Sequence, residues 1–384
     1  MESCRLADST AERGDPVKLK DKLIQLDIRG RRTIVISDIH GELALFKQLL
    51  KKTGWSDDDR LIINGDILDK GQDSLGTMKF IRELAESDNV YVIEGNCDRF
   101  FDELEADWLY AYMDCRHTAA HEFLRETGTT LEDYPAQSDF ARAVLEQYGD
   151  FQQWFRNLPT AIETEDYLFV HAGIEADYLE TPREVALTMP EFYSRTHHLD
   201  KTVVVGHYPA ANFVEDGLYS HEVKVNQARR IIALDGGNQV KASGQLNALI
   251  IEADGSLDTM SVDAHPSRLV IQDFEVTLQE PHSFTFPDYE IKAFEGDAHF
   301  TFAEHLSSQT QLMVKTEWIK EQDGRHYLND DYTDLFLDVT AGEEVKVVGE
   351  YAGYVLIKRN GLVGWVPEEV LDTSTDKASD ISHV

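Results

Sequence analysis

The chain has 384 residues, of which 42% are hydrophobic and 28% are charged, a composition typical of a globular protein and long enough for two domains. Asp and Glu outnumber Lys and Arg by 71 to 36, which gives a formal net charge of −35. Because a negative field repels polyanions, this balance argues against nucleic acid and anionic membranes as partners, and a phosphate substrate would need bound cations.

Targeting signals are not evident in the sequence. No stretch reaches the length of a membrane span, and the first twenty residues lack the apolar core of a signal peptide. Cys4, Cys97 and Cys115 form no disulfide framework, so we expect reduced thiols. These features predict a cytoplasmic protein.

The first half of the chain alternates strand-like and helix-like segments. Residues 1–31 are charged and predict an arm with a short helix around 17–26. Three apolar runs then end in polar loops, in "RTIVISDIHGE", "RLIINGDILDKG" and "NVYVIEGNCD". Helical periodicity follows the first two, in "LALFKQLLKK" and "LGTMKFIRELAES".

A helical stretch separates these strands from four more. Residues 99–158 are rich in charge and aromatics and predict an inserted helical cap. Further strand candidates are "YLFVHAG", "TVVVGHYPA", "RIIALDGG" and "LNALIIEADG". Past about residue 265 short β-rich runs dominate, so we expect a first domain over 32–262 and a β-rich segment over 263–334, followed by 335–372 and a frayed tail over 373–384.

Polar side chains follow the ends of the predicted strands. They are carboxylate, amide and imidazole groups, namely Asp38, His40, Asp66, Asn96, His171 and His207. Alternate residues of an extended segment face the same side, so Asp38 and His40 suit one ion, while Asp66 is placed to bridge to a second. Such donors suit Mn, Fe or Zn, and two neighbouring ions can hold a phosphate and activate water.

Five sequence pieces stand in order, each after a strand-like run: "SDIHGE", "NGDILDKG", "EGNCD", "FVHAG" and "VVGHYP". Together they resemble the calcineurin-like metallophosphoesterases over residues 32–253. The resemblance implies an α/β (α+β) fold of two packed β-sheets flanked by helices, with the site at the strand ends. It also implies two divalent metal ions, with Mn the first expectation. Asp38 and His40 would hold the first ion, Asp66 would bridge, and the second ion would be held by Asn96, His171 and His207.

Within that family, the chain looks similar to the bacterial serine/threonine phosphoprotein phosphatases and the symmetrical diadenosine tetraphosphate hydrolases. Diesterase branches tend to carry a second histidine two places beyond the one that matches His207. That place is Pro209 in this chain. The resemblance therefore favours the phosphatase branch.

Two positions depart from the family pattern. The usual arginine after the bridging aspartate is Lys70, a point charge in place of a bidentate fork. Arg99 and Arg195 are candidates for the missing fork, and a plain exposed arginine is the alternative for each. The usual histidine general acid is Cys97, although its partner Asp69 is retained. A neighbouring carboxylate would raise the pKa of the thiol and metal ions would lower it, so Cys97 is either an acid or a packing residue.

Two further features have competing interpretations. His117 and His121, near Cys115, form either a zinc site or a polar helix face. Residues 335–372 resemble bacterial Src-homology-3-like barrels, which either bind a peptide or only pack against the rest of the protein.

The sequence thus predicts a metal-dependent phosphatase that acts on a phosphorylated protein or a small phosphoester, with Lys70 holding the phosphoryl oxygens. The alternatives are a dinucleoside polyphosphate hydrolase or phosphodiesterase, and a non-catalytic sensor of phosphate ligands.

Overall fold

The computed structural model describes residues 17–277 and 280–372, so the expected tail and most of the expected arm lie outside the described residues. The chain divides into two compact units. The first comprises the residues up to Ala210 together with Val223–Asp263, and the second comprises Ala211–Glu222 together with the residues from Ala264 onward. Each unit is described by itself.

One sheet of the first unit has the strand order β11-β10-β2-β3-β4. β2, β3 and β4 are parallel, whereas β10 runs antiparallel to β2 and β11. All four residues of β2 are buried, as expected for a parallel strand covered on both faces. The strands are β2 (Thr33–Ile36), β3 (Arg60–Asn64), β4 (Val90–Ile93), β10 (Leu246–Ile251) and β11 (Leu257–Val262).

The other sheet of this unit has the order β1-β5-β6-β7-β9-β8. Parallel pairs join β1 to β5, β6 to β7 and β7 to β9, and the remaining pairs are antiparallel. The strands are β1 (Leu23–Gln25), β5 (Ala161–Glu163), β6 (Tyr167–Val170), β7 (Thr202–Val205), β8 (Lys224–Asn226) and β9 (Ile231–Ala233).

Side-chain alternation packs the two sheets together. Val35 of β2 belongs to a buried cluster with Phe169 of β6 and Val204 of β7. Ile34 and Ile36 point the other way, into a cluster built with the helices. The predicted architecture of packed sheets flanked by helices is therefore confirmed.

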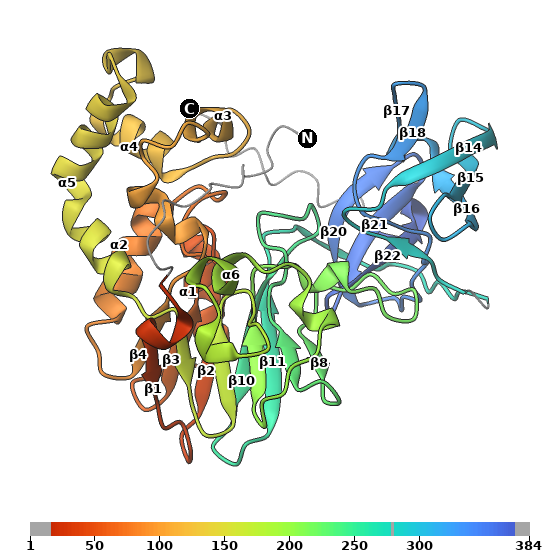
Figure 1. Cartoon of the computed structure of the whole chain (residues 1–384). Coiled ribbons are helices and arrows are strands. Elements are labelled where there is room, and N and C mark those ends of the chain that lie inside the picture. The colour runs from red at the N-terminus through yellow and green to blue at the C-terminus, as the bar shows by residue number, and fades with distance from the viewer. Residues whose placement is uncertain (1–16, 278–279, 373–384) are drawn as a thin grey trace. The chain divides into compact units, whose positions relative to one another are not determined.

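Two helices cover the outer face of the first sheet (Figure 1): α1 (Leu43–Thr53) and α2 (Ser74–Leu84). α1 buries one stripe that includes Phe46 and Leu49. It ends at Gly54, whose φ of 67° lies in the left-handed region that glycine adopts at low cost. The sequence predicts both helices.

The segment predicted as a cap is helical and joins the same core. It contains η3 (Cys97–Asp102), α3 (Leu109–Met113), α4 (Ala119–Thr127), η4 (Leu131–Asp133) and α5 (Gln137–Asn157). Buried aromatic residues, among them Phe101, Phe123 and Phe140, pack in the cluster that also contains α1 and α2. α5 bends at Tyr148, whose φ is −124°.

The remaining short helices of the first unit are η2 (Leu19–Lys22), η5 (Tyr178–Glu180), α6 (Arg183–Thr188) and η6 (Phe192–Ser194), and η7 (Ala210–Asn212) lies where the chain enters the second unit. The expected helix around 17–26 is thus wrong in type. A 3₁₀ turn and strand β1 take its place, because Leu23–Gln25 pairs with β5, a long-range contact that no local pattern reveals.

Where the structure describes the second unit, its elements are β-strands and 3₁₀ turns. A four-stranded sheet has the order β12-β20-β21-β22, and a five-stranded sheet has the order β16-β15-β14-β18-β17. The first contains β12 (Ser267–Leu269), β20 (Glu344–Tyr351), β21 (Tyr354–Arg359) and β22 (Leu362–Pro367), and η9 (Glu368–Val370) follows it. The second contains β14 (Glu290–Gly296), β15 (Phe300–His305), β16 (Thr310–Lys315), β17 (Ile319–Gln322) and β18 (Arg325–Leu328), with η8 (Thr316–Trp318) before β17.

A small pair, β13 (Ser283–Phe284) with β19 (Tyr332–Thr333), completes this unit. Trp365 of β22 shares a buried cluster with Trp318 and Tyr332. Strands from both sides of residue 335 therefore share one core. The predicted boundary between the segments 263–334 and 335–372 stays a prediction. The sheets formed by the described residues are open, so the expected Src-homology-3-like barrel is not confirmed.

Two other expectations can be compared with the structure. None of the helices in the described ranges is long and apolar enough to cross a lipid bilayer. Cys97 is a free thiol, but Cys115 is disulfide-bonded, so the expectation of reduced thiols is wrong at Cys115.

Candidate metal centre

The strand ends bring the predicted donors to one place. Asp38 and His40 follow β2, and Asp66 follows β3. Asn96 and Cys97 follow β4, while His171 and His207 follow β6 and β7 of the other sheet. Because β2, β3 and β4 are parallel, their carboxyl ends lie at the same edge of the sheet, which is where open α/β sheets bind ligands.

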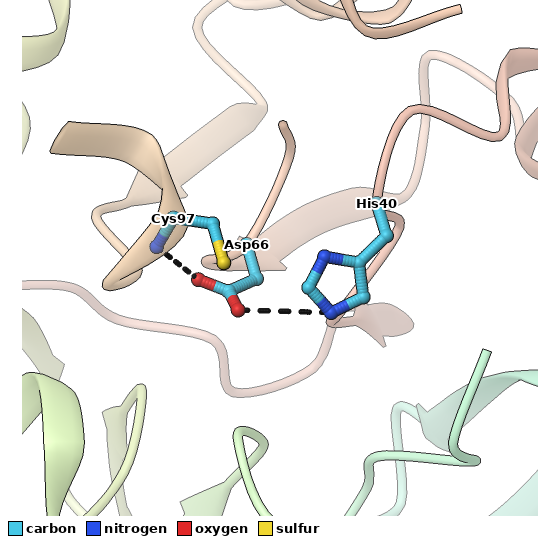
Figure 2. Close-up of side chains that lie close together, drawn as sticks. All are labelled: His40, Asp66 and Cys97. Atoms are coloured by element: carbon cyan, nitrogen blue, oxygen red, sulfur yellow. Dashed lines mark hydrogen bonds and ion pairs between the residues drawn. The ribbon is translucent and has the colours of Figure 1, made fainter. Parts of the chain in front are cut away.

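Asp66 lies at the centre of the cluster. Its Oδ1 is 3.3 Å from His171 Nε2, and its Oδ2 is 3.7 Å from His40 Nε2. Figure 2 shows the latter contact, and it also shows the backbone N–H of Cys97, which donates to Oδ1 at 2.9 Å. The two carboxylate oxygens therefore face different imidazoles.

Asn96 joins the two histidines of the second sheet. Its Oδ1 lies 3.1 Å from His171 Nε2 and 2.8 Å from His207 Nδ1. Asp38 lies on the other side of the cluster, with Oδ1 3.9 Å from His40 Nε2. The N–H of His207 donates to both oxygens of Asp38 at 3.2 Å.

Two groups of side chains place their donor atoms close enough together to hold a metal ion. Within the described residues these groups are His40, Asp66 and Cys97, and Asp66, His171 and His207, with donor atoms of each group within 4.8 Å of one another. Asp66 belongs to both groups. The Nδ1 atoms of His40 and His171 lie 3.2 Å and 2.9 Å from the carbonyl oxygens of Leu68 and Asn64, which leaves each Nε2 toward Asp66. Orientation of imidazoles by outer hydrogen bonds is typical of metal ligands, so these residues fit divalent ions.

The backbone at this cluster is strained. Asp38, His40, Asp66 and His207 have φ values of 54°, 49°, 53° and 65°, in the left-handed region that side chains other than glycine rarely adopt. Asp69 and Lys70, in the loop that follows Asp66, share this conformation at 64° and 73°. Such outliers gather at functional sites, where the surrounding structure holds them.

Asp98, which the sequence analysis did not assign, holds the Asp66 loop. Its Oδ1 accepts from the N–H groups of Ile67 and Leu68 at 2.8 and 3.3 Å. Its Oδ2 accepts from the N–H groups of Asp66 and Gly95 at 3.1 and 2.8 Å. One buried carboxylate thus binds the loops after both β3 and β4. Its position beside Asn96 in "EGNCD" was visible, but the direction of its side chain was not.

Asp235 was also missed, although it follows strand β9 as Asp38 follows β2. Its Oδ1 accepts from Gly237 N–H at 2.7 Å, and its buried Oδ2 has no hydrogen-bond partner among the described residues. Burial and the nearby Asp38 raise the pKa of Asp235 well above its ordinary value. A strand end followed by aspartate was the available signal.

Burial controls the charges of the cluster. It raises the pKa of Asp38 to about 8, with the charge of Asp66 adding to the effect. Burial lowers the pKa of His40 to about 3, and Lys70 acts in the same direction. Burial alone would raise the pKa of Asp66, but His171, His40 and Lys70 hold it below its ordinary value. Asp66 is therefore the anionic centre of the group.

Lys70 and Asp69 stand beside this centre. Lys70 Nζ lies 3.0 Å from His40 Nε2 and 3.9 Å from Asp66 Oδ2. Asp69 Oδ1 accepts from the N–H of Ala119, the first residue of α4, at 2.9 Å. Burial raises the pKa of Asp69 to about 7. The cap therefore contacts the loop that carries both residues.

Cys97 lies at the edge of the cluster. Its Sγ is 3.5 Å from Asn96 Nδ2, and it lines a pocket together with Asp69. Burial, and then the charge of Asp66, raise the pKa of the thiol well above its ordinary value, although Lys70 opposes the shift. Burial and the neighbouring carboxylate thus both favour the neutral thiol.

The two arginine candidates lie in different settings. Arg99 is half-buried and forms ion pairs with Glu103, at 3.3 Å, and with Glu184. Arg195 is exposed, and its Nε donates to the carbonyl oxygen of Pro190 at 3.3 Å. Arg99 Nε also donates to the backbone carbonyl oxygen of Asn96 at 3.4 Å, so Arg99 borders the cluster, whereas the described contacts of the Arg195 side chain do not include the residues around Asp66.

The histidines in the cap do not form a metal group in the described structure. The rings of His117 and His121 are stacked with centroids 5.2 Å apart, but neither belongs to the two donor groups above. His117 Nε2 lies 3.5 Å from Glu122 Oε1, and the N–H of Thr118 donates to His121 Nδ1 at 3.2 Å. These contacts favour the polar helix face over the zinc site.

The fold and the site together define a two-sheet α/β protein with a cluster of carboxylate, amide and imidazole groups at its strand ends. The chain belongs to the calcineurin-like phosphoesterase family, whose model matches residues 31–233. The resemblance drawn from the five sequence pieces is thereby confirmed for this domain.

Two curated relatives are bis(5'-nucleosyl)-tetraphosphatases. The chain is 26% identical to the asymmetrical enzyme PrpE of Geobacillus sp. (strain WCH70) over 157 residues, or 38% of this chain and 58% of that protein. It is 27% identical to the symmetrical enzyme of Haemophilus ducreyi over 149 residues, or 38% of this chain and 46% of that protein. The chain thus spans about half the length of the curated relatives it matches.

One solved structure, of a cold-active protein-tyrosine phosphatase from a psychrophilic Shewanella species, is 17% identical and covers 63% of this chain and 83% of its own, with a TM-score of 0.41. At that score the likeness bears neither on the site nor on the substrate of this chain.

Proposed function

We propose that this chain is a phosphoesterase that uses two divalent metal ions to hydrolyse phosphate monoesters, with phosphorylated protein as the first substrate class. The observation that carries the proposal is that Asp66 belongs to both groups of donor atoms. A carboxylate whose two oxygens face different imidazoles suits a pair of ions that share one ligand. Membership of the calcineurin-like phosphoesterase family supports the same chemistry.

The metal ligands in this proposal come from both sheets. Mn is the first expectation for the ions, followed by Fe or Zn. When bound, such ions polarise the phosphoryl oxygens and activate water. Asp66 is the shared ligand, and the others are Asp38, His40, Asn96, His171 and His207. Asp98 has a positioning role, because it binds the N–H groups of both loops that carry Asp66 and Asn96.

The chain supplies the remaining groups of the reaction. Lys70, within 3.9 Å of Asp66, offers an ammonium to the phosphoryl oxygens. Water forms the new bond to phosphorus while the bond to the ester oxygen breaks. Cys97 belongs to the first donor group, but in this proposal Asp38 takes its place as ligand and the thiol keeps its proton. The leaving oxygen takes that proton from the Cys97 thiol, and the proton released by the attacking water restores the thiol through solvent. Arg99 and Arg195 remain proposals for substrate binding only.

A specific observation favours a second candidate, a dinucleoside polyphosphate hydrolase. Both curated relatives named above carry that activity in their names. Against it, the net charge of −35 disfavours a substrate with several phosphates more than a monoester. A non-catalytic sensor of phosphate ligands is the third candidate. A peptide partner for the second unit and a cytoplasmic location stay predictions from the sequence.

A substrate panel tests the proposal. The full chain, loaded with Mn, is assayed against p-nitrophenyl phosphate, a set of phosphopeptides and diadenosine tetraphosphate. We expect hydrolysis of the monoesters. Preference for diadenosine tetraphosphate would favour the second candidate, and inactivity on all three with metal bound would favour the sensor.

A further inference from the structure

A small cavity adjoins the candidate metal centre on the side of the cap. Its wall includes Asn96 and Cys97, which follow β4, and Asp69, which lies in the loop after β3. Tyr112 of α3 lines it from the cap. The space inside, about 20 Å³, suits one water molecule and no larger group.

Two polar groups that line this cavity have no hydrogen-bond partner in the part of the chain that the structure describes. Asp69 Oδ1 accepts from the N–H of Ala119 at 2.9 Å, but its Oδ2 accepts none from the described residues. The hydroxyl of Tyr112 likewise forms no hydrogen bond with any of them. Polar groups that fold away from solvent are usually satisfied by protein or by ordered water. A water in this cavity would accept from the phenol and donate to the carboxyl oxygen, which satisfies both groups.

Tyr112 is well placed to act as a hydrogen-bond donor. Its ring lies edge to face with that of Trp108, with centroids 5.7 Å apart. Burial, and then Cys97, raise the pKa of the phenol above its ordinary value, although Lys70 opposes the shift. The phenol therefore keeps its proton near neutral pH. Because Cys97 and Lys70 both act on it, the phenol lies beside the proposed reacting centre.

The other groups that line the cavity compete little for such a water. Arg99 is ion-paired with Glu103, at 3.3 Å, and with Glu184. The two unpartnered groups therefore offer the water its strongest hydrogen bonds. The remaining lining side chains are apolar, namely Phe100, Trp108 and Leu109.

We propose that one water occupies this cavity and that Tyr112, acting through it, positions a hydrogen bond to the leaving oxygen of the ester. This inference rests on the proposed function, in which Cys97, which lines the same cavity, gives its proton to that oxygen. The water accepts from Tyr112, donates one hydrogen to Asp69 and directs the other to the leaving oxygen. Such a hydrogen bond matters most in esters with poor leaving groups, where that oxygen gains the most negative charge in the transition state.

Tyr112→Phe tests this role, because it removes the hydroxyl and keeps the ring. On the Mn-loaded full chain, kcat for a phosphoserine peptide should fall roughly tenfold, the factor that one hydrogen bond supplies. Its KM, and the kcat for p-nitrophenyl phosphate, should change less than about twofold, because the hydrogen bond acts on the leaving oxygen in the transition state.

The matched control is Tyr110→Phe, which should leave both substrates unchanged. Tyr110 lies on the same helix, but its ring packs on Phe140 outside the cavity. Equal losses on both substrates in Tyr112→Phe would indicate a structural role and overturn the inference. No loss on either substrate would overturn it as well.

A crystal structure of the Mn-loaded full chain tests the water without turnover. We expect one ordered water within about 3.2 Å of both Tyr112 Oη and Asp69 Oδ2. An empty cavity, at a resolution that shows ordered waters elsewhere in the protein, would overturn the inference, and this measurement decides if Tyr112→Phe does not fold. Inactivity of the unmodified chain on every ester would contradict the proposed function, whereas an active enzyme with an empty cavity would contradict this inference alone.

Discussion

At the scale of single residues, Cys97 is the departure from the family pattern with the sharpest chemical consequence. A thiol with an ordinary pKa of about 8.5 can donate a proton, but it brings no positive charge to a departing oxygen as imidazolium would. We expect esters with good leaving groups to react fastest, and Cys97→His to speed alkyl esters most. Cys97→Ser should slow alkyl esters selectively.

The dependence of kcat on leaving-group pKa, in wild type and both variants, checks this expectation. A shallow slope that neither substitution changes would leave Cys97 as a packing residue.

Lys70 provides the second prediction at this scale. Its ammonium lies 3.9 Å from Asp66, where it repels any other cation. Lys70→Met should therefore tighten Mn binding by at least about tenfold and lower kcat/KM by roughly 100-fold, since a donor to the phosphoryl group is lost. Calorimetry and initial rates measure the two effects separately.

The matched control is Lys79→Met, because Lys79 contacts Tyr148 and Glu126. This variant should change neither quantity. Unchanged or weaker Mn binding in Lys70→Met would show that the lysine does not compete with the ions.

At the scale of elements, two carboxylates link the N-termini of α2 and α4 to the Lys70 loop. Glu122 of α4 accepts from the N–H groups of Ser74 and Leu75, the first residues of α2, at 2.6 and 2.8 Å. Asp69 in turn accepts from the first N–H of α4. Carboxylates at helix N-termini satisfy N–H groups that otherwise lack partners.

We expect Glu122→Ala to lower the free energy of unfolding by about 1–2 kcal/mol and to raise the KM for p-nitrophenyl phosphate, because the loop that carries Lys70 loses support. Glu122→Gln keeps a hydrogen-bond acceptor, so it should recover part of the lost free energy of unfolding and part of the change in KM. Glu146→Ala, at an exposed position of α5, serves as control in urea unfolding and steady-state assays. Equal losses in both alanine variants would mean that the cap does not position the loop.

The sequence predicts elements well where local patterns decide them. The apolar runs that became β2, β3 and β4 and the polar residues after them were visible without the structure. The capping of α4 by Asp69, the capping of α2 by Glu122 and the three N–H bonds from the Asp66 loop to Asp98 were not visible, because they join residues far apart in the chain. The strand β1 was mistaken for helix for the same reason.

At the scale of the whole molecule, domain membership also escaped the sequence. Ala211–Glu222 belongs to the second unit, where Tyr219 shares a core with Trp318 and Trp365. The amino-acid composition does not change where the chain enters the second unit at Ala211 or where it leaves it after Glu222. Sheet closure is likewise set by long-range pairing, which explains why a barrel pattern in the sequence did not yield a closed barrel.

The net charge of −35 leads to a prediction about salt. An anionic substrate approaches against this field, and salt screens it. We expect kcat/KM for p-nitrophenyl phosphate to rise by roughly twofold or more between about 0.01 M and about 0.15 M ionic strength at constant free Mn. Initial rates in two inert salts measure the effect. A fall in both salts would mean that local cations, and not the global field, control substrate approach.

The central claim is that Asp66 joins two metal ions in one hydrolytic site. The most direct measurement is titration of the metal-stripped full chain with Mn, in wild type and in Asp66→Asn, with bound metal and p-nitrophenyl phosphate hydrolysis followed together. We expect wild type to bind two ions and to gain activity with them. Asp66→Asn should bind one ion or none and lose more than about 100-fold in rate, because a shared anionic ligand is lost. Full activity in Asp66→Asn, or full wild-type activity with a single ion, would contradict the account.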